Sequence, residues 1–191
     1  MKTTLTLVCL ALLFRGPAAR QDKAPAPPRP VAVFAELDGR WRGTFVGYDK
    51  GGAELYRIAV EQTYRTIDPH TQRVELRDTM ADGKVITGTG FNRAERRKDG
   101  TLKLSCEVRK SNGEHVIHRG RTVRGPAGEP QIVWSSDAPR RIETFREWVT
   151  HAEGRTRYHI HGMGVYGGTP MLMAGEYQRV PNGPVSRPTV R

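Results

Sequence analysis

Residues Leu37–Phe45 read LDGRWRGTF, and this stretch decides the expected fold. A single helical turn is predicted just before it, over Phe34–Leu37, and Gly39 ends that turn. The first strand then begins near Trp41. Because an indole needs a large, dry site, we expect Trp41 to be buried, and we expect the helical turn to plug one end of the folded unit.

Turn-forming clusters punctuate the chain after this stretch. Between them, apolar and polar residues alternate with a period of two, as in half-buried strands. Ile58 and Val60, for example, alternate with Arg57 and Glu61. The clusters that predict hairpin turns include Asp49–Gly52, Ala81–Lys84, Lys98–Gly100, Ser111–Glu114 and Ala152–Gly154.

The pattern predicts an all-β, antiparallel fold of about nine or ten strands joined mostly by short turns. The chain has 191 residues, of which 21 are Gly and 13 are Pro, a composition that argues against long helices. A meander of this length leaves two open edges unless it curls shut. An up-and-down β-barrel is therefore predicted, with a β-sandwich as the alternative.

The Leu37–Phe45 stretch resembles the Gly-x-Trp entry to the first strand in the calycin superfamily, which includes lipocalins, fatty-acid-binding proteins and nitrobindin-like barrels. Tyr177–Arg179, near the predicted end of the last strand, is also similar. In that superfamily the Trp seals the base of the barrel and an Arg from a late strand packs across its ring. The resemblance implies these structural roles for Trp41 and Arg179 in a lipocalin-like barrel.

The two ends of the chain differ in composition from its middle. Residues 1–19 combine Lys2, an apolar run and small residues, the layout of a signal peptide. We therefore expect a secreted or periplasmic protein. A proline-rich linker over residues 20–32, the barrel over 33–180 and a disordered tail over 181–191 complete the predicted organisation. No stretch approaches the roughly 20 apolar residues that cross a bilayer, so no membrane span is predicted.

Cys106 is the one cysteine left after removal of residues 1–19, because Cys9 lies within the apolar run. An intrachain disulfide is then excluded. Cys106 alternates with Leu104 and Val108 on one predicted strand, so we expect a buried, inert thiol.

Residues 158–163 read YHIHGM, and MLM follows at 171–173. Residues two apart on a strand project the same way, so His159, His161 and Met163 form a row. Imidazoles and thioethers together favour copper over magnesium or calcium. This row is the predicted candidate for a metal site.

The competing interpretation places the same row in solvent. If the hairpin pairs Met163 with Met171, then His161 lies opposite Met173 and the two side chains share a face. A shift of one residue puts Met171 and Met173 on the opposite face. If Tyr158 and Ile160 face the core instead, the two histidines are exposed. The preceding predicted strand favours exposure, because Glu143 is expected to pair with His161 in an exterior salt link.

Two further histidines, His115 and His118, flank another predicted strand. They project to opposite faces, so at most one of them enters the barrel. Acid–base use would require an interior histidine near a carboxylate, and the sequence assigns no such partner. A nucleophile elbow, a glycine-rich phosphate loop and zinc-type Cys/His spacing are all absent from the sequence.

Three basic stretches predict an anion-binding patch: Arg93–Lys98, Arg119–Arg124 and Arg140–Arg141. The formal charge is +11, and it falls to +9 without residues 1–19, which contain Lys2 and Arg15 and no acid. Export and sparse aromatic residues argue against nucleic acid as a partner. An anionic envelope surface is the expected polyanion.

The leading hypothesis is an exported, lipocalin-like barrel that holds a small apolar or amphipathic ligand, with no catalysis assigned. Its expected ligand-binding residues are Tyr158, His161, Met173 and Tyr177. Two alternatives stay open. One is a copper-handling protein or enzyme that uses the row of His159, His161 and Met163, and the other is an envelope-surface module that binds polyanions. The sequence assigns no cofactor and no oligomeric state.

Overall fold

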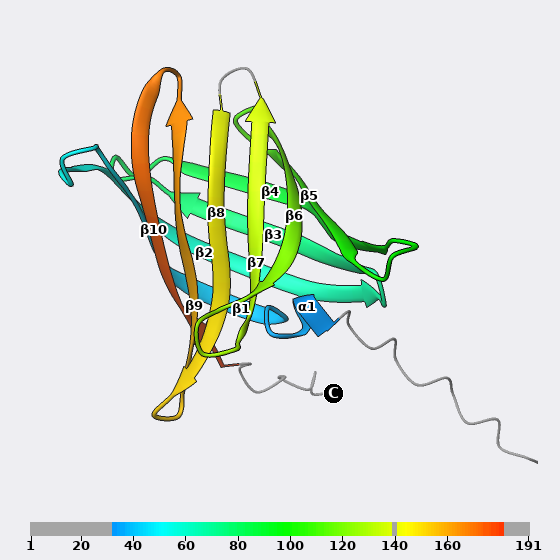
Figure 1. Cartoon of the computed structure of the whole chain (residues 1–191). Coiled ribbons are helices and arrows are strands. Elements are labelled where there is room, and N and C mark those ends of the chain that lie inside the picture. The colour runs from blue at the N-terminus through cyan, green and yellow to red at the C-terminus, as the bar shows by residue number, and fades with distance from the viewer. Residues whose placement is uncertain (1–31, 139–140, 182–191) are drawn as a thin grey trace, which may run out of the picture.

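Ten strands follow one another along the described residues, 32–138 and 141–181 of this computed structural model. Each strand pairs antiparallel with its neighbours in sequence, and β1 also pairs with β10, which closes the sheet (Figure 1). The predicted antiparallel up-and-down β-barrel is confirmed. The elements are α1 (Ala32–Ala35), β1 (Gly39–Tyr48), β2 (Glu54–Asp68), β3 (Thr71–Thr79), β4 (Val85–Arg96), β5 (Leu102–Lys110), β6 (His115–Arg124), β7 (Pro130–Ala138), β8 (Arg141–Ala152), β9 (Arg155–Tyr166) and β10 (Thr169–Val180).

The short helix α1 begins two residues earlier than the predicted turn over Phe34–Leu37 and lies at one end of the barrel (Figure 1). It buries Phe34 almost completely, together with Leu37 from the turn that follows. The Gln72 side-chain amide on β3 donates hydrogen bonds to the Phe34 carbonyl oxygen at 3.1 Å and to Asp38 Oδ1 at 2.8 Å. These bonds attach the helical segment to the barrel wall.

Trp41 lies at the same end and is only 1% exposed. Its indole N–H donates to the Leu37 carbonyl oxygen at 2.7 Å, so the polar atom of the ring is satisfied. The guanidinium carbon of Arg179 lies 4.7 Å from the centre of the Trp41 ring. Since Trp41 and Arg179 are direct partners in the β1–β10 register, this contact spans the seam that closes the barrel.

The orientation expected for β8 is wrong. Glu143 and Glu147 face the interior and are each 6% exposed, whereas Ile142 is 56% exposed on the outer face. The reason is that Phe145 and Val149 share the face of the two glutamates and pack against the core. The burial of those two apolar side chains offsets the cost of placing carboxylates inside.

The predicted signal peptide, the linker up to residue 31 and the tail after Pro181 lie outside the described residues. The linker's last residue, Ala32, begins α1. Among the described residues, no helix is long and apolar enough to cross a membrane.

Truncation of the barrel floor should destabilise the fold strongly. We expect Trp41→Ala to lower the free energy of unfolding by about 3–5 kcal/mol, because a large buried ring is lost. Arg179→Ala should cost less than about 1 kcal/mol, as expected of a cation–π contact at the surface. Urea denaturation measures both, with Arg121→Ala on β6 as a surface control. A Trp41→Ala cost equal to that of the control would contradict the role of Trp41 as a packed floor.

Candidate functional site

The interior of the barrel contains a cavity of about 240 Å³, and each of the ten strands contributes side chains to its lining. Trp41 and Phe34 fill the end of the barrel and do not line this space. The walls are mainly apolar, with a few polar groups that converge on the interior. Eight aromatic side chains line it: Phe45, Tyr56, Tyr64, Trp134, Phe145, Tyr158, Tyr166 and Tyr177.

Glu147 on β8 is a buried acid of the cavity. The Tyr158 hydroxyl donates to Glu147 Oε2 at 2.5 Å, and the side chain of Trp134 also donates to this carboxylate. Burial raises the pKa of Glu147 from 4.5 to about 7, and the two hydrogen bonds oppose part of that rise. Glu147 therefore titrates near neutral pH while it faces the cavity.

The titratable groups closest to Glu147 are neutral at that pH. Burial raises the pKa of Tyr64, Tyr158 and Tyr177 above the usual value for a phenol. Burial also raises the pKa of the Cys106 thiol to about 12, with the charges of Glu147 and Glu107 adding to the effect. Cys106 is thus held as a thiol in the cavity wall, which leaves it a poor nucleophile.

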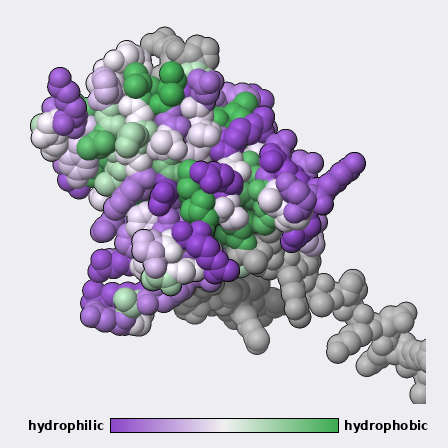
Figure 2. Space-filling view, viewed as in Figure 1, coloured by the Kyte–Doolittle hydropathy of each residue, from purple (hydrophilic) through white to green (hydrophobic). Residues whose placement is uncertain are grey.

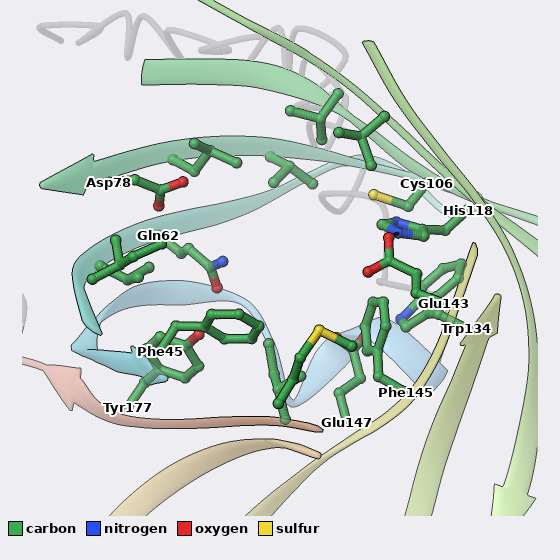
Figure 3. A pocket seen from close by; sticks show the side chains of 18 of the residues that line it. Phe45, Gln62, Asp78, Cys106, His118, Trp134, Glu143, Phe145, Glu147 and Tyr177 are labelled. Atoms are coloured by element: carbon green, nitrogen blue, oxygen red, sulfur yellow. Dashed lines mark hydrogen bonds and ion pairs between the residues drawn. The ribbon is translucent and has the colours of Figure 1, made fainter. Parts of the chain in front are cut away.

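A second acid, Glu143, lies on the same strand and carries a histidine partner. His118 Nε2 is 2.7 Å from Glu143 Oε1, and the imidazole packs edge-on against Phe145 with ring centres 5.0 Å apart. Figure 3 shows His118, Glu143, Phe145 and Glu147 along one wall of the cavity. His115, as expected from its spacing, faces outward, where it contacts Glu107. The interior histidine therefore has the carboxylate that acid–base chemistry requires.

Charged pairs occupy the end of the cavity opposite Trp41. Lys110 Nζ lies 3.4 Å from Asp78 and 3.5 Å from Glu114. Arg141 contacts Glu114 and lies 3.7 Å from Glu143. Burial raises the pKa of Asp78, and the nearby Lys110 opposes that rise. Both permanent cations of the cavity are thus already paired with acids.

Three of the four residues expected to bind the ligand line the cavity: Tyr158, Met173 and Tyr177. His161 does not, because it lies on the outer face of β9. The β9–β10 register places His161 opposite Ala174, and Met173 opposite Gly162. This register differs by one residue from the pairing of His161 with Met173 that the metal hypothesis requires, and the shift puts the two side chains on opposite faces.

The row of His159, His161 and Met163 lies on the outside of β9, where Met163 is exposed. Trp148 packs beside both imidazoles, with each pair of ring centres 5.0 Å apart. His159 Nε2 lies 3.0 Å from the Thr150 hydroxyl. Nowhere in residues 32–138 and 141–181 do three or more His, Cys, Asp or Glu side chains gather in a way that could hold a metal ion.

The basic stretches separate in the structure. Arg93 on β4 and Arg119 on β6 lie on either side of Ser105 on the outer face. Arg141 instead lines the cavity, and Arg140 is outside the described residues. Of the three stretches, the structure thus brings together Arg93 of the first and Arg119 of the second, and separates Arg141 from them.

An apolar patch covers the outer face of β8–β10 near the cavity's charged end. Figure 2 shows hydrophobic residues gathered toward the upper end of these strands, in the orientation of Figure 1. The exposed side chains of this outer β8–β10 patch are Ile142, Met163, Val165 and Leu172.

The sequence reasoning missed the polar groups that line the cavity. The sequence predicts an exterior salt link for Glu143 and assigns no carboxylate partner to His118, and it gives no role in the cavity to Glu147. Phe145 and Val149 are the sequence signal for the inward face of β8. They lie on the same face as Glu143 and Glu147, opposite to that of Ile142. The contact between His118 and Glu143 joins β6 to β8, so no local pattern reveals it.

Neither a family model nor a curated protein matches the chain. Solved structures do resemble its fold. Rv2717c from M. tuberculosis is 16% identical, with 80% of this chain and 100% of that chain covered and a TM-score of 0.52. The S-type phycobiliprotein lyase CPES from Guillardia theta is 13% identical, with 78% and 90% covered and a TM-score of 0.53. At these identities the likeness shows the fold alone, a closed antiparallel β-barrel.

The raised pKa of Glu147 makes folding depend on pH. Below about pH 4.5 the carboxyl is protonated in both the folded and the unfolded chain. Between 4.5 and about 7 the unfolded chain ionises first, so stability falls as pH rises. We expect wild type to lose about 3 kcal/mol relative to Glu147→Gln across this range, measured by urea denaturation at several pH values. Parallel stability curves for the two proteins would contradict the assignment.

Proposed function

We propose that the protein binds one small apolar or amphipathic molecule inside the barrel, without a catalytic step. The observation that carries this proposal is the cavity of about 240 Å³. Mainly apolar walls with a few convergent polar groups are typical of ligand-binding sites. The calycin-like fold is compatible with this use, since barrels of this size leave room for a single small ligand.

The size of the cavity limits the ligand. An apolar cavity of about 150 Å³ in another protein accommodates benzene, so a space of about 240 Å³ suits a molecule with two fused rings. The proposal includes export, which is supported by the apolar run and small residues that follow Lys2 in the sequence. An exported barrel of this kind would meet its ligand outside the cytoplasm.

Filling the cavity should weaken binding of a neutral two-ring probe. Val116 lines the cavity on β6 and is 6% exposed, whereas the next residue, Ile117, is 41% exposed on the outer face. We expect Val116→Phe to weaken binding of naphthylmethanol at least about tenfold, because the new ring occupies the space. Ile117→Phe is the matched control and should bind as wild type does. Fluorescence titration measures both.

Two results would overturn the proposal. One is a wild-type protein that binds neither naphthylmethanol nor its analogues with an ammonium or a carboxylate group, naphthylmethylamine and naphthoate. The other is equal binding by Val116→Phe and Ile117→Phe, which would place the probe outside the barrel. Unfolding curves of both variants establish that each is folded at the temperature of the titration.

The grouping of Arg93 and Arg119 favours a second candidate function, docking on an anionic phospholipid surface. The two side chains flank Ser105 on the outer face of β4–β6, and Arg121 lies two residues further along the same face of β6. Basic side chains on one face attract anionic headgroups, and the attraction weakens as salt rises. Such docking would use a different surface from the cavity.

Removal of two of these charges should weaken membrane binding. We expect Arg119→Gln with Arg121→Gln to reduce binding to vesicles of phosphatidylcholine and phosphatidylglycerol by roughly ten- to thirtyfold at low salt. Arg146→Gln with Arg157→Gln, on β8 and β9, changes the net charge equally and serves as control. Vesicle co-sedimentation measures both. Equal loss in the two double variants would mean that net charge alone attracts the protein and that the β4–β6 face has no special role.

A further inference from the structure

One acid of the cavity has no cationic partner among the described side chains. The cavity is lined by three carboxyl groups, those of Asp78, Glu143 and Glu147. Lys110 lies beside Asp78, and both Arg141 and His118 lie beside Glu143. Glu147 has only neutral hydrogen-bond donors, the Tyr158 hydroxyl and the Trp134 side chain.

The surroundings of Glu147 leave its charge uncompensated when it ionises. The titratable groups that face it come from β2, β5, β9 and β10, and they are Tyr64, Cys106, Tyr158 and Tyr177. All four remain neutral because burial raises their pKa. A buried carboxylate without a cation is unfavourable, so a ligand that brings a positive charge would remove that penalty.

Aromatic rings surround the same position. The Tyr158 ring lies 6.2 Å from that of Tyr64, edge to face, and 5.2 Å from that of Tyr177. Figure 3 shows Phe145 and Trp134 near the two glutamates, with Phe45 and Tyr177 across the cavity. Aromatic faces attract organic cations more strongly when water is excluded. A carboxylate within such a group of rings is a set of contacts suited to an ammonium ion.

We propose that the preferred ligand is a small organic cation, an alkyl ammonium carried on an apolar ring system, whose charged group pairs with Glu147. This inference rests on the proposed function, because it assigns a chemical class to the molecule in the cavity. The ring system packs against aliphatic side chains of the same cavity, including Val60, Val108 and Ile160. Glu147 is the residue that selects the charge.

An anionic ligand fits the cavity less well. To reach a positive charge it would have to displace Asp78 from Lys110, or Glu114 and Glu143 from Arg141. It would also share the interior with Glu147. A neutral alcohol avoids both costs but leaves the carboxylate without a cation. The expected order of affinity is therefore ammonium, then alcohol, then carboxylate, for one ring system.

Three analogues with the same ring and attachment point test this order: naphthylmethylamine, naphthylmethanol and naphthoate. At about pH 8, where Glu147 is ionised, wild type should bind the amine at least about tenfold more tightly than the alcohol. Glu147→Gln should lose this preference and bind the amine and the alcohol equally. Glu95→Gln, on the exposed end of β4, changes the net charge equally and should keep the wild-type preference.

A pH profile of the wild type tests the same claim without any substitution. Protons compete with the ammonium for Glu147, so affinity for the amine should fall about tenfold between about pH 8 and pH 6, while the alkyl ammonium itself stays protonated. Affinity for the alcohol should stay constant. Other charged groups of the cavity, His118 and Glu143 among them, are unchanged in Glu147→Gln, so that variant should show no such fall with pH.

The outcomes separate this inference from the proposed function. Alcohol and amine that bind wild type equally would overturn the cation preference and leave the ligand-binding barrel intact. A preference for the amine that persists in Glu147→Gln would also overturn it, since the selecting charge would lie elsewhere. Failure of all three probes to bind wild type would overturn the proposed function itself.

Discussion

The pairing of β1 with β10 closes the sheet, and the interior exists only because of that seam. Trp41 and Arg179 face each other across it, so one contact connects the first strand to the last. The indole also anchors the segment before β1 through its hydrogen bond to the Leu37 carbonyl oxygen. Closure and the sealed floor therefore depend on the same side chain. Without them the carboxyl groups on β8 would be open to water at one end.

Inside the barrel, small residues make room for large ones. A Cβ atom at Gly120 would lie 2.4 Å from the ring of Trp134, so that ring requires glycine on the neighbouring strand. The charged groups of the cavity differ in their partners. Lys110 and Arg141 each pair with an acid near one end of the barrel, Asp78 and Glu143 respectively. Glu147 instead accepts a hydrogen bond from a neutral group, the Tyr158 hydroxyl. Burial brings the pKa of Glu147 near neutrality. The same burial makes the ionised carboxylate destabilise the folded protein, and it is the reason for the affinity that we propose for a cation.

The architecture was predictable because its signals are local. Turn clusters and alternation mark each strand, and a meander with no other partner for its edges must close. The inward residues of β8 were not predictable in this way, since each face of that strand mixes polar and apolar side chains. Ile142 and Trp148 lie on one face of β8, while Phe145 and Val149 lie on the other and pack against the core. The β9–β10 register was similarly open, and a one-residue difference moved His161 away from Met173. Contacts such as His118 with Glu143 arise only after closure and leave no trace in sequence spacing.

A crystal structure of the protein with naphthylmethanol tests the central claim most directly, because it locates the probe without reference to affinity. The account predicts that the ring system lies inside the barrel, in contact with Val116 and the aromatic side chains around Tyr158. The competing location is the outer β8–β10 patch, which exposes Ile142, Met163 and Leu172. A probe bound on that outer patch, with the interior free of it, would contradict the account.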